Sequence, residues 1–218
     1  MINTGIKKLD QLLDGGIKNG IITDIFGANG TGKTQLAMQI SINSLKQGGK
    51  ILFLDTTGEF RPERMLEIIK SQNLNSSLLD NVFVGRITNT AEQIQFLSKL
   101  TQMNNFSLVV IDNVSDLFSF EYSKKEQTLE KNSSFMKYMH DLSLIAIQKK
   151  IPIVVTNIVR NIGDLELENL DKSISMFTHL KIKLIKNGNG YVGEIFPSYL
   201  GKRKFSYLIT PEGLTESS

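Results

Sequence analysis

Apolar residues gather in short runs along this chain, and segments of helical period separate the runs. Five runs stand out: IITDIF (21–26), ILFLD (51–55), NVFVG (81–85), SLVVID (107–112) and IPIVVT (151–156). Near-continuous runs rich in Val and Ile are typical of buried parallel strands that are covered on both faces. Between the runs, apolar residues recur at helical spacing, as in Leu36, Ala37 and Ile40, in Met65, Ile68 and Ile69, in Ala91, Ile94, Leu97 and Leu100, and in Phe135, Met139, Leu142 and Ala146. This alternation predicts an α/β fold with a mostly parallel, twisted sheet flanked by helices.

The pattern changes near residue 180, where apolar and polar positions begin to alternate. Leu180, Ile182 and Leu184 alternate with Lys181 and Lys183, which is the period of a strand with two different faces. NGNG (187–190) then gives a strong hairpin signal, and residues 191–196 and 205–209 are predicted to form two further strands. We therefore expect a C-terminal antiparallel extension of the parallel sheet. Because no repeat or Pro/Gly-rich linker divides the sequence, residues 1–218 are predicted to form a single domain.

Composition narrows the class of protein without identifying it. The chain has 218 residues, of which 40% are hydrophobic and 22% are charged, as in an ordinary globular protein. No apolar run approaches the roughly 20 residues that span a membrane. No signal peptide is visible and Cys is absent, which excludes disulfides and thiolate metal sites. We expect a cytoplasmic protein that has no membrane partner. The net charge of +3 is too small to indicate nucleic-acid binding by itself.

A phosphate-binding loop follows the first predicted strand directly. GANGTGKT (27–34) fits G-x-x-x-x-G-K-[ST] between a strand and a helix, which is the context that this motif needs. Backbone N–H groups and the helix N-terminus would supply positive potential to a phosphate. Lys33 would reach the β- and γ-phosphates, which makes it a catalytic candidate, and the Thr34 hydroxyl would bind Mg²⁺. The alternative is a glycine-rich turn that binds nothing. The predicted nucleotide-binding residues are Gly27, Ala28, Asn29, Gly30, Thr31, Gly32, Lys33, Thr34 and Gln35.

Asp112 ends the run SLVVID and is the predicted partner of Thr34 at Mg²⁺. An aspartate that ends a buried strand beside a phosphate loop typically contacts the ion directly or through water. The alternative is that Asp112 caps the following helix, because Asp is common at that position. The presence of a phosphate loop favours the metal role.

Three segments extend the match beyond the phosphate loop. TGIKKLDQLLDGG (4–16), GTGKTQLA (30–37) and LDTTGEFRPERM (54–65) resemble, in order and spacing, the RecA-type recombinases, most of all their archaeal RadA/RadB and eukaryotic branch. The likeness continues through GRITNTAEQ (85–93), SLVVIDNVSDLF and IPIVVTN (151–157) and weakens after Asn157. The resemblance implies a RecA-like P-loop NTPase fold that binds ATP and Mg²⁺ and works with DNA in homologous recombination and repair.

The resemblance also implies residue roles, and this sequence departs from some of them. In the family, an arginine at the position of Arg64 stacks on adenine, as a planar guanidinium can. A glutamate at the position of Thr57 orients the attacking water, and a glutamine at the position of Ile158 senses the γ-phosphate. Neither Thr57 nor Ile158 can replace those groups. Glu59 points to the same side as Thr57 in an extended segment but is displaced by about 3.3 Å per residue. We favour a solvated loop carboxylate for Glu59 and keep a catalytic role as the alternative.

DNA contacts are predicted in three places. In the family, two loops after the fourth and fifth strands face single-stranded DNA, and they map to Phe120–Gln127, with Lys124 and Lys125, and to Val159–Ser175, with Arg160. The second loop is acidic overall, which is a poor match for phosphates. A solvated loop is the alternative for the first. Basic residues also gather near the C-terminus, where they either contact DNA or keep an edge strand soluble: Lys181, Lys183, Lys202, Arg203 and Lys204.

The departures indicate a short, core-only paralog of the RadB type. None of the 12 phenylalanines has Ala three residues later, so the Phe-x-x-Ala segment of the family is absent, and we expect no helical DNA-binding domain before the core. We expect an accessory protein that assists a RadA-type recombinase on single-stranded DNA, in the nucleoid, with weak or absent ATP hydrolysis. One alternative is a DNA-stimulated ATPase that uses Glu59. The other is a signalling ATPase of the KaiC type, against which the FRPER stretch argues.

Overall fold

One sheet organises the chain, and the predicted strand–helix alternation is confirmed. The computed structural model describes residues 1–162, 165–196 and 203–217. The strands are β1 (Ile22–Gly27), β2 (Ile51–Asp55), β3 (Val82–Arg86), β4 (Leu108–Asp112), β5 (Ile153–Ile162), β6 (Leu165–Glu168), β7 (Leu180–Asn187), β8 (Gly190–Phe196), β9 (Arg203–Thr210) and β10 (Gly213–Glu216). The helices are α1 (Lys7–Leu12), α2 (Lys33–Lys46), α3 (Pro62–Ser71), α4 (Thr90–Gln102), α5 (Asp116–Glu121), α6 (Thr128–Lys149) and α7 (Asp171–Ile174), with 3₁₀ turns η1 (Ser76–Asn81) and η2 (Lys125–Gln127).

The strand order is β10-β9-β8-β7-β1-β5-β4-β2-β3, and β6 pairs with β5 beside this path. From β3 to β7 neighbouring strands run parallel, and from β7 to β10 they run antiparallel. The mostly parallel sheet with an antiparallel C-terminal extension is therefore as predicted. The arrangement is that of a RecA-like α/β fold, and it places the phosphate loop after a central strand.

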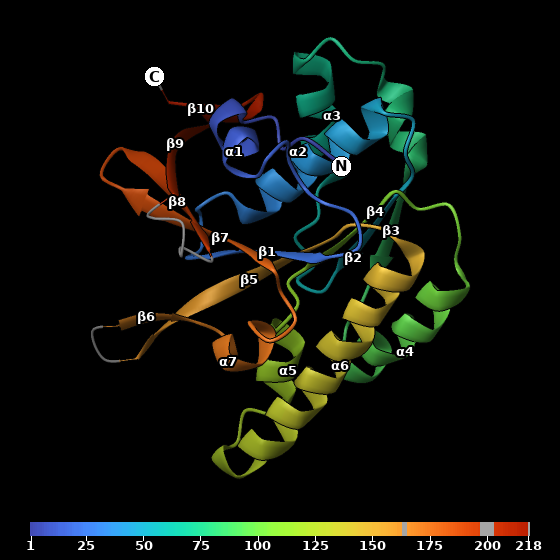
Figure 1. The fold of residues 1–218 in the computed structure, drawn as a ribbon, viewed down its shortest axis with the longest axis vertical. Coiled ribbons are helices and arrows are strands. Elements are labelled where there is room, and N and C mark those ends of the chain that lie inside the picture. The colour runs from blue at the N-terminus through green and yellow to red at the C-terminus, as the bar shows by residue number, and fades with distance from the viewer. Residues whose placement is uncertain (163–164, 197–202, 218) are drawn as a thin grey trace.

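Helices cover both faces of the parallel part because successive strand residues point to opposite sides. On β2, Ile51 and Phe53 pack with α2 and α3, while Leu52 and Leu54 pack with α4, α5 and α6. Figure 1 shows α1, α2 and α3 on one side of the sheet and α4, α5 and α6 on the other. Among the described residues, no helix has the length and apolarity that a membrane crossing requires.

Two details of the predicted core are wrong. β3 is an edge strand, so Phe83 and Val84 are 46% and 49% exposed instead of buried. On α4, Leu97 and Leu100 are buried, but Ala91 and Ile94 face solvent, and Thr90 and Gln93 take the inner positions. A step of three residues drifts around a helix of 3.6 residues per turn, so a stripe with that step leaves the buried face.

The predicted second DNA loop, Val159–Ser175, is for the most part regular structure. β5 continues to Ile162 and forms an antiparallel ladder with β6, in which Val159 pairs with Glu168 and Arg160 pairs with Leu167. A short helix, α7, follows. The segment is a hairpin because β5 extends beyond its parallel neighbours and takes a new partner there. Residues 163 and 164, which include Asp164, lie outside the described part of the chain.

Candidate nucleotide-binding site

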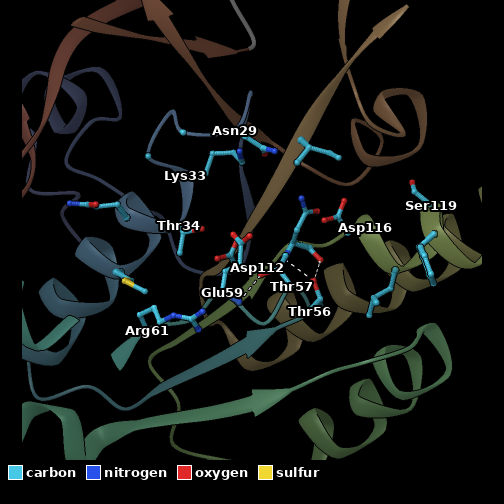
Figure 2. Close-up of a pocket in the computed structure, with 18 of the residues that line it drawn as sticks. Asn29, Lys33, Thr34, Thr56, Thr57, Glu59, Arg61, Asp112, Asp116 and Ser119 are labelled. Carbon is cyan, nitrogen blue, oxygen red and sulfur yellow. Dashed lines mark hydrogen bonds between the residues drawn. The ribbon is translucent and has the colours of Figure 1, made fainter. Parts of the chain in front are cut away.

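A cavity of about 1240 Å³ opens at the carboxyl ends of the parallel strands. Ligand sites of open α/β sheets are found at this edge. Its walls come from the phosphate loop with the start of α2, from the segment after β2, from the residues after β4, from β5 and from β9. Figure 2 shows that Lys33, Thr34, Asp112 and Asp116 belong to this single cavity. The predicted residues that line it are Asn29, Gly30, Gly32, Lys33, Thr34, Gln35, Glu59, Arg64, Asp112 and Arg160.

The phosphate loop has a fixed shape because its own groups and β9 hold it. Gly32 has φ +91°, a left-handed conformation, and a Cβ there would approach Ile209 and Leu214. The Thr31 hydroxyl donates to the Ala28 carbonyl at 2.8 Å, and the Tyr207 hydroxyl donates to the Thr31 carbonyl at 2.7 Å. Gly27 ends β1, and α2 begins at Lys33. The loop therefore presents the N-terminus of α2 to the cavity.

Lys33 forms a hydrogen bond within the loop. Its Nζ donates to the Ala28 carbonyl at 3.0 Å. Burial lowers the pKa of Lys33, whereas the carboxylates of Asp112, Asp116 and Glu59 act against that shift.

Asp112 and Thr34 meet at the carboxyl end of β4. Asp112 is 4% exposed and accepts a hydrogen bond from the Thr156 hydroxyl. Burial raises the pKa of Asp112, while hydrogen bonds from the hydroxyls of Thr156 and Thr34 act in the opposite direction. The following helix, α5, has Ser115 at its N-cap position, so the alternative role of Asp112 as the cap of that helix is wrong. A carboxylate and a hydroxyl are the oxygen ligands that Mg²⁺ prefers, and the pair fits that ion.

The residues after β2 form a rigid turn around Asp55. Its carboxylate accepts hydrogen bonds from the backbone N–H groups of Thr57 at 3.0 Å and Gly58 at 2.8 Å. The Thr57 hydroxyl donates to the same carboxylate at 3.0 Å. Glu59 is exposed but lines the cavity, where its charge acts on Lys33. Hydrogen bonds to the Asp55 carboxylate thus fix the turn, and the Thr57 hydroxyl takes part in them. Glu59 is the acidic residue of this turn that lines the cavity.

Arg64 anchors the β9–β10 turn against α3. Its guanidinium donates to the carbonyls of Thr210 at 2.7 Å and Pro211 at 3.0 Å, and it pairs with Glu67 at 2.9 Å. Gln35 donates to the Thr210 carbonyl from the other side at 3.2 Å. Arg64 and Gln35 therefore join two cavity walls that are far apart in the sequence.

Two cavity residues have a position that local sequence reasoning did not reveal. Asp116, the first residue of α5, lines the cavity, and it lies four residues after Asp112. Arg160, predicted as a DNA contact, lines the same cavity from β5. The sequence signal for Asp116 was a second aspartate one helical turn after the strand, a signal that is too common to be specific.

The basic face that was predicted near the C-terminus is wrong at Lys181. This residue is 9% exposed, and its ammonium pairs with Asp24, Glu168 and Asp171. The physical reason is that β7 lies inside the sheet between β1 and β8 and is not an edge strand. Lys181 is thus a buried ion-pair residue and is not available to DNA.

Of the other predicted DNA contacts, some are bonded to protein groups, two are exposed, and one lies outside the described residues. Lys183 pairs with Glu166 of the hairpin at 3.0 Å, and Lys204 pairs with Glu194. The Arg203 guanidinium donates to the Leu12 carbonyl at 2.9 Å. Lys124 and Lys125 are exposed at η2. Lys202 lies outside the described residues.

A buried polar network connects the end of β4 with the base of the β5–β6 hairpin. The Ser115 hydroxyl donates to Asn157 Oδ1 at 2.5 Å, and Asn157 Nδ2 donates to Glu168 at 2.6 Å. Asn169 Nδ2 donates to the hydroxyls of Ser115 at 2.7 Å and Ser119 at 2.8 Å. Buried polar groups that are mutually bonded fix the relative position of their elements. The segments that carry Asp116 and Arg160 are therefore held together.

Two comparisons of the sequence with known proteins point to one family. The sequence matches the model of the Rad51 family over residues 1–176. It is also 34% identical over 174 residues to a protein of Cenarchaeum symbiosum that is named DNA repair and recombination protein RadA. The aligned part is 75% of this chain and 44% of that protein, so the chain spans less than half the length of this relative.

Proposed function

The chain belongs to the Rad51 family, and from this premise we propose that it is an ATP-binding protein of homologous recombination and DNA repair. The observation that carries the proposal is the arrangement of Lys33, Thr34 and Asp112 in one cavity. We propose that the protein is of the RadB type and that it assists a RadA-type recombinase in the cytoplasm, at the nucleoid.

ATP and Mg²⁺ would use groups that already face the cavity. The phosphates would lie on the backbone N–H groups of the loop and at the N-terminus of α2. Lys33 would leave the Ala28 carbonyl, to which it donates at 3.0 Å, and contact the β- and γ-phosphates. Thr34 and Asp112 would hold Mg²⁺, an ion that supplies charge neutralisation at the phosphates.

The turn after β2 supports the proposal of weak or absent hydrolysis. Thr57 has no carboxylate to orient a water molecule, and its hydroxyl is bonded to Asp55 at 3.0 Å. Without a group that positions the water, a bound triphosphate persists and can serve as a signal for assembly. Nucleotide binding would then act as a switch for association with the recombinase and DNA.

Single-stranded DNA would meet the protein at η2 and its neighbours. Lys124 and Lys125 are exposed there, and Tyr122 lies close in sequence. Lysine can contact the phosphate backbone, and tyrosine can stack on a base. The ion pairs of Lys183 and Lys204 make these two residues weaker candidates.

The test is ATP binding by the Lys33→Ala variant. We expect the variant to lose measurable affinity in equilibrium dialysis with Mg²⁺-ATP, because the loop keeps its shape but loses its cation. Lys172→Ala is the matched control, since Lys172 is exposed and does not line the cavity. Equal affinities for wild type and Lys33→Ala would contradict the proposal.

Glu59 supports a second candidate function, a DNA-stimulated ATPase. Its carboxylate lines the cavity and acts electrostatically on Lys33, and both observations support a role for Glu59 as a general base toward a water molecule. The test is ATP turnover with single-stranded DNA. Loss of turnover in Glu59→Gln, together with its retention in Thr57→Ala, would support this function, and turnover that is indifferent to Glu59 would reject it.

A further inference from the structure

Asp116 and Arg160 carry opposite charges and line the same cavity as the phosphate loop, and the positive charge of Arg160 acts on the Asp116 carboxylate. We propose that Arg160 contacts the terminal phosphate of bound ATP, and that Asp116 attracts Arg160 while that phosphate is absent. The pair would then distinguish ATP from ADP. This inference rests on the proposed binding of ATP and deepens it, because it names the residues that read the nucleotide state.

The register of the sheet places Arg160 beside the phosphate loop. Gly27, the first residue of the loop motif, pairs with Ile158 of β5. β5 continues beyond this point to Ile162, so Arg160 lies in the part of the strand that passes the loop. Ile158 and Arg160 are two residues apart and point to the same side, and both line the cavity. Ile158 offers no hydrogen bond to a phosphate, whereas Arg160 offers a charged fork.

The ion-binding residues show at which end of the nucleotide this wall lies. Mg²⁺ bridges the β- and γ-phosphates in P-loop proteins, and Asp112 ends β4. Asp116 follows one helical turn later and lines the same cavity as Arg160. Arg64 lies in another part of the cavity, against the β9–β10 turn. A triphosphate that runs along the loop toward Asp112 therefore brings its last phosphate toward Arg160.

The charges around Asp116 favour a competition for Arg160. Burial raises the pKa of Asp116, while the positive charges of Arg160 and Lys33 act in the opposite direction and the charge of Glu59 adds to the effect of burial. Arg160 is exposed, and its long side chain is not packed into the core. A phosphate is a better bidentate partner for a guanidinium than a carboxylate that must remain near Lys33. ADP lacks the terminal phosphate and would leave Arg160 with Asp116.

Buried hydrogen bonds hold the backbone segments that carry Asp116 and Arg160 in fixed relative positions. Ser115, which precedes Asp116, donates to Asn157 at 2.5 Å, and Asn157 lies on β5 three residues before Arg160. The Thr156 hydroxyl donates to Asp112 from the same strand. Because the backbones are fixed, a change of partner by Arg160 is a movement of its side chain over the β5–β6 hairpin. The surface of that hairpin would differ between the ATP-bound and ADP-bound states.

The experiment compares the affinity for Mg²⁺-ADP with that for the Mg²⁺ complex of a non-hydrolysable ATP analogue, measured by isothermal titration calorimetry. In Arg160→Ala, the affinity for the analogue should fall about ten- to a hundred-fold, as expected for a lost charge-assisted hydrogen bond. The affinity for ADP should change much less. In Asp116→Asn, the analogue should bind several-fold more tightly, because a negative charge near the terminal phosphate is removed. Arg160→Lys should fall between wild type and Arg160→Ala.

Lys172→Ala is the control for a lost positive charge in the same part of the chain, and it should leave both affinities unchanged. Equal losses for both nucleotides in Arg160→Ala, or no loss for either, would overturn the proposal. An unchanged ratio together with weaker binding of single-stranded DNA would identify Arg160 as a DNA contact instead. No effect of Asp116→Asn would overturn the role of Asp116. If Lys33→Ala still abolishes ATP binding in any of these cases, the proposed function stands while this inference fails.

Discussion

At the residue scale, Arg64 joins two segments that the sequence separates widely. Its guanidinium reaches the carbonyls of Thr210 and Pro211 from α3. The resemblance implied that this arginine stacks on adenine. The hydrogen bonds show a structural role for Arg64, because its guanidinium holds the β9–β10 turn that forms one wall of the cavity.

The first prediction is that Arg64→Ala lowers both stability and ATP affinity. The two lost hydrogen bonds to carbonyls should reduce the free energy of unfolding by about 1–2 kcal/mol in urea titrations. Arg64→Lys should recover only part of the loss, because an ammonium cannot present two parallel donors. Arg61→Ala is the control for stability only, since Arg61 also lines the cavity but donates to carbonyls of its own turn, those of Gly58 and Phe60. A loss in Arg61→Ala as large as that in Arg64→Ala would contradict the prediction.

The second prediction concerns Lys181, which is surrounded by acidic groups. Burial lowers the pKa of Lys181, but Glu168 and Asp24 outweigh this effect and raise the pKa above 10.5. Because the folded-state pKa is above the unfolded one, this group contributes its full stability below pH 10.5 and loses it as pH rises through the folded-state value. In Lys181→Met, the buried carboxylates lose their cation, which should cost about 3–5 kcal/mol near neutral pH.

Urea unfolding of both proteins at increasing pH checks this prediction. The difference in the free energy of unfolding should be largest below pH 10.5 and should shrink above it. Tyrosines and other lysines titrate in both proteins, so their effects largely cancel in the difference. A difference that grows with alkaline pH would contradict the assignment of the charge to Lys181.

At the scale of elements, the sequence predicts features with local signals and misses features that depend on how distant segments pack together. The phosphate loop and the strand that ends at Asp112 could be predicted because their signals lie within a few neighbouring residues. The burial of Lys181 could not be predicted from the sequence, because its partners Asp24 and Glu168 come from other strands. Alternation along β7 shows that two faces exist but not that β8 and β1 flank the strand. The position of Arg160 in the cavity lining depends on the register of β5 with β1, which the periodicity of the sequence does not contain.

The third prediction concerns the support that β9 gives to the phosphate loop. The buried Tyr207 hydroxyl donates to the Thr31 carbonyl at 2.7 Å. Tyr207→Phe should reduce the free energy of unfolding by about 1 kcal/mol and weaken ATP binding, because the loop loses a fixed contact. Tyr191→Phe is the matched control. Tyr191 stacks on Tyr207 with 5.3 Å between ring centroids, and no hydrogen bond of its hydroxyl is found within the described residues. Equal nucleotide affinities for wild type and Tyr207→Phe would argue against this support.

At the scale of the whole molecule, the sheet crosses from β10 to β3 without a division. Hydrophobic cores on its two faces each draw on residues from several strands, and α2 packs against both β10 and the parallel strands. These features favour the single domain that the sequence predicts for residues 1–218.

The fourth prediction is therefore one cooperative unfolding transition. The chain has no Trp, so fluorescence reports on the surroundings of its five tyrosines, while far-ultraviolet circular dichroism reports on all helices and strands. The two signals should give the same midpoint in urea, as required for two-state behaviour. Separate midpoints would show that the antiparallel extension unfolds as its own unit.

The hydrogen bonds between α2 and β10 have a consequence for synthesis of the protein on the ribosome. Gln39 of α2 donates to the carbonyls of Thr4 and Leu214 and accepts from the Leu214 N–H. The phosphate loop leaves the ribosome long before Leu214 and the carbonyls that hold Arg64 are translated. Until then, the nascent chain contains the phosphate loop but lacks the part of the cavity wall that β9 and the β9–β10 turn supply. We therefore expect the cavity to take its final shape only after the β9–β10 turn and Leu214 have been translated, when Gln39 and Arg64 can reach their partners.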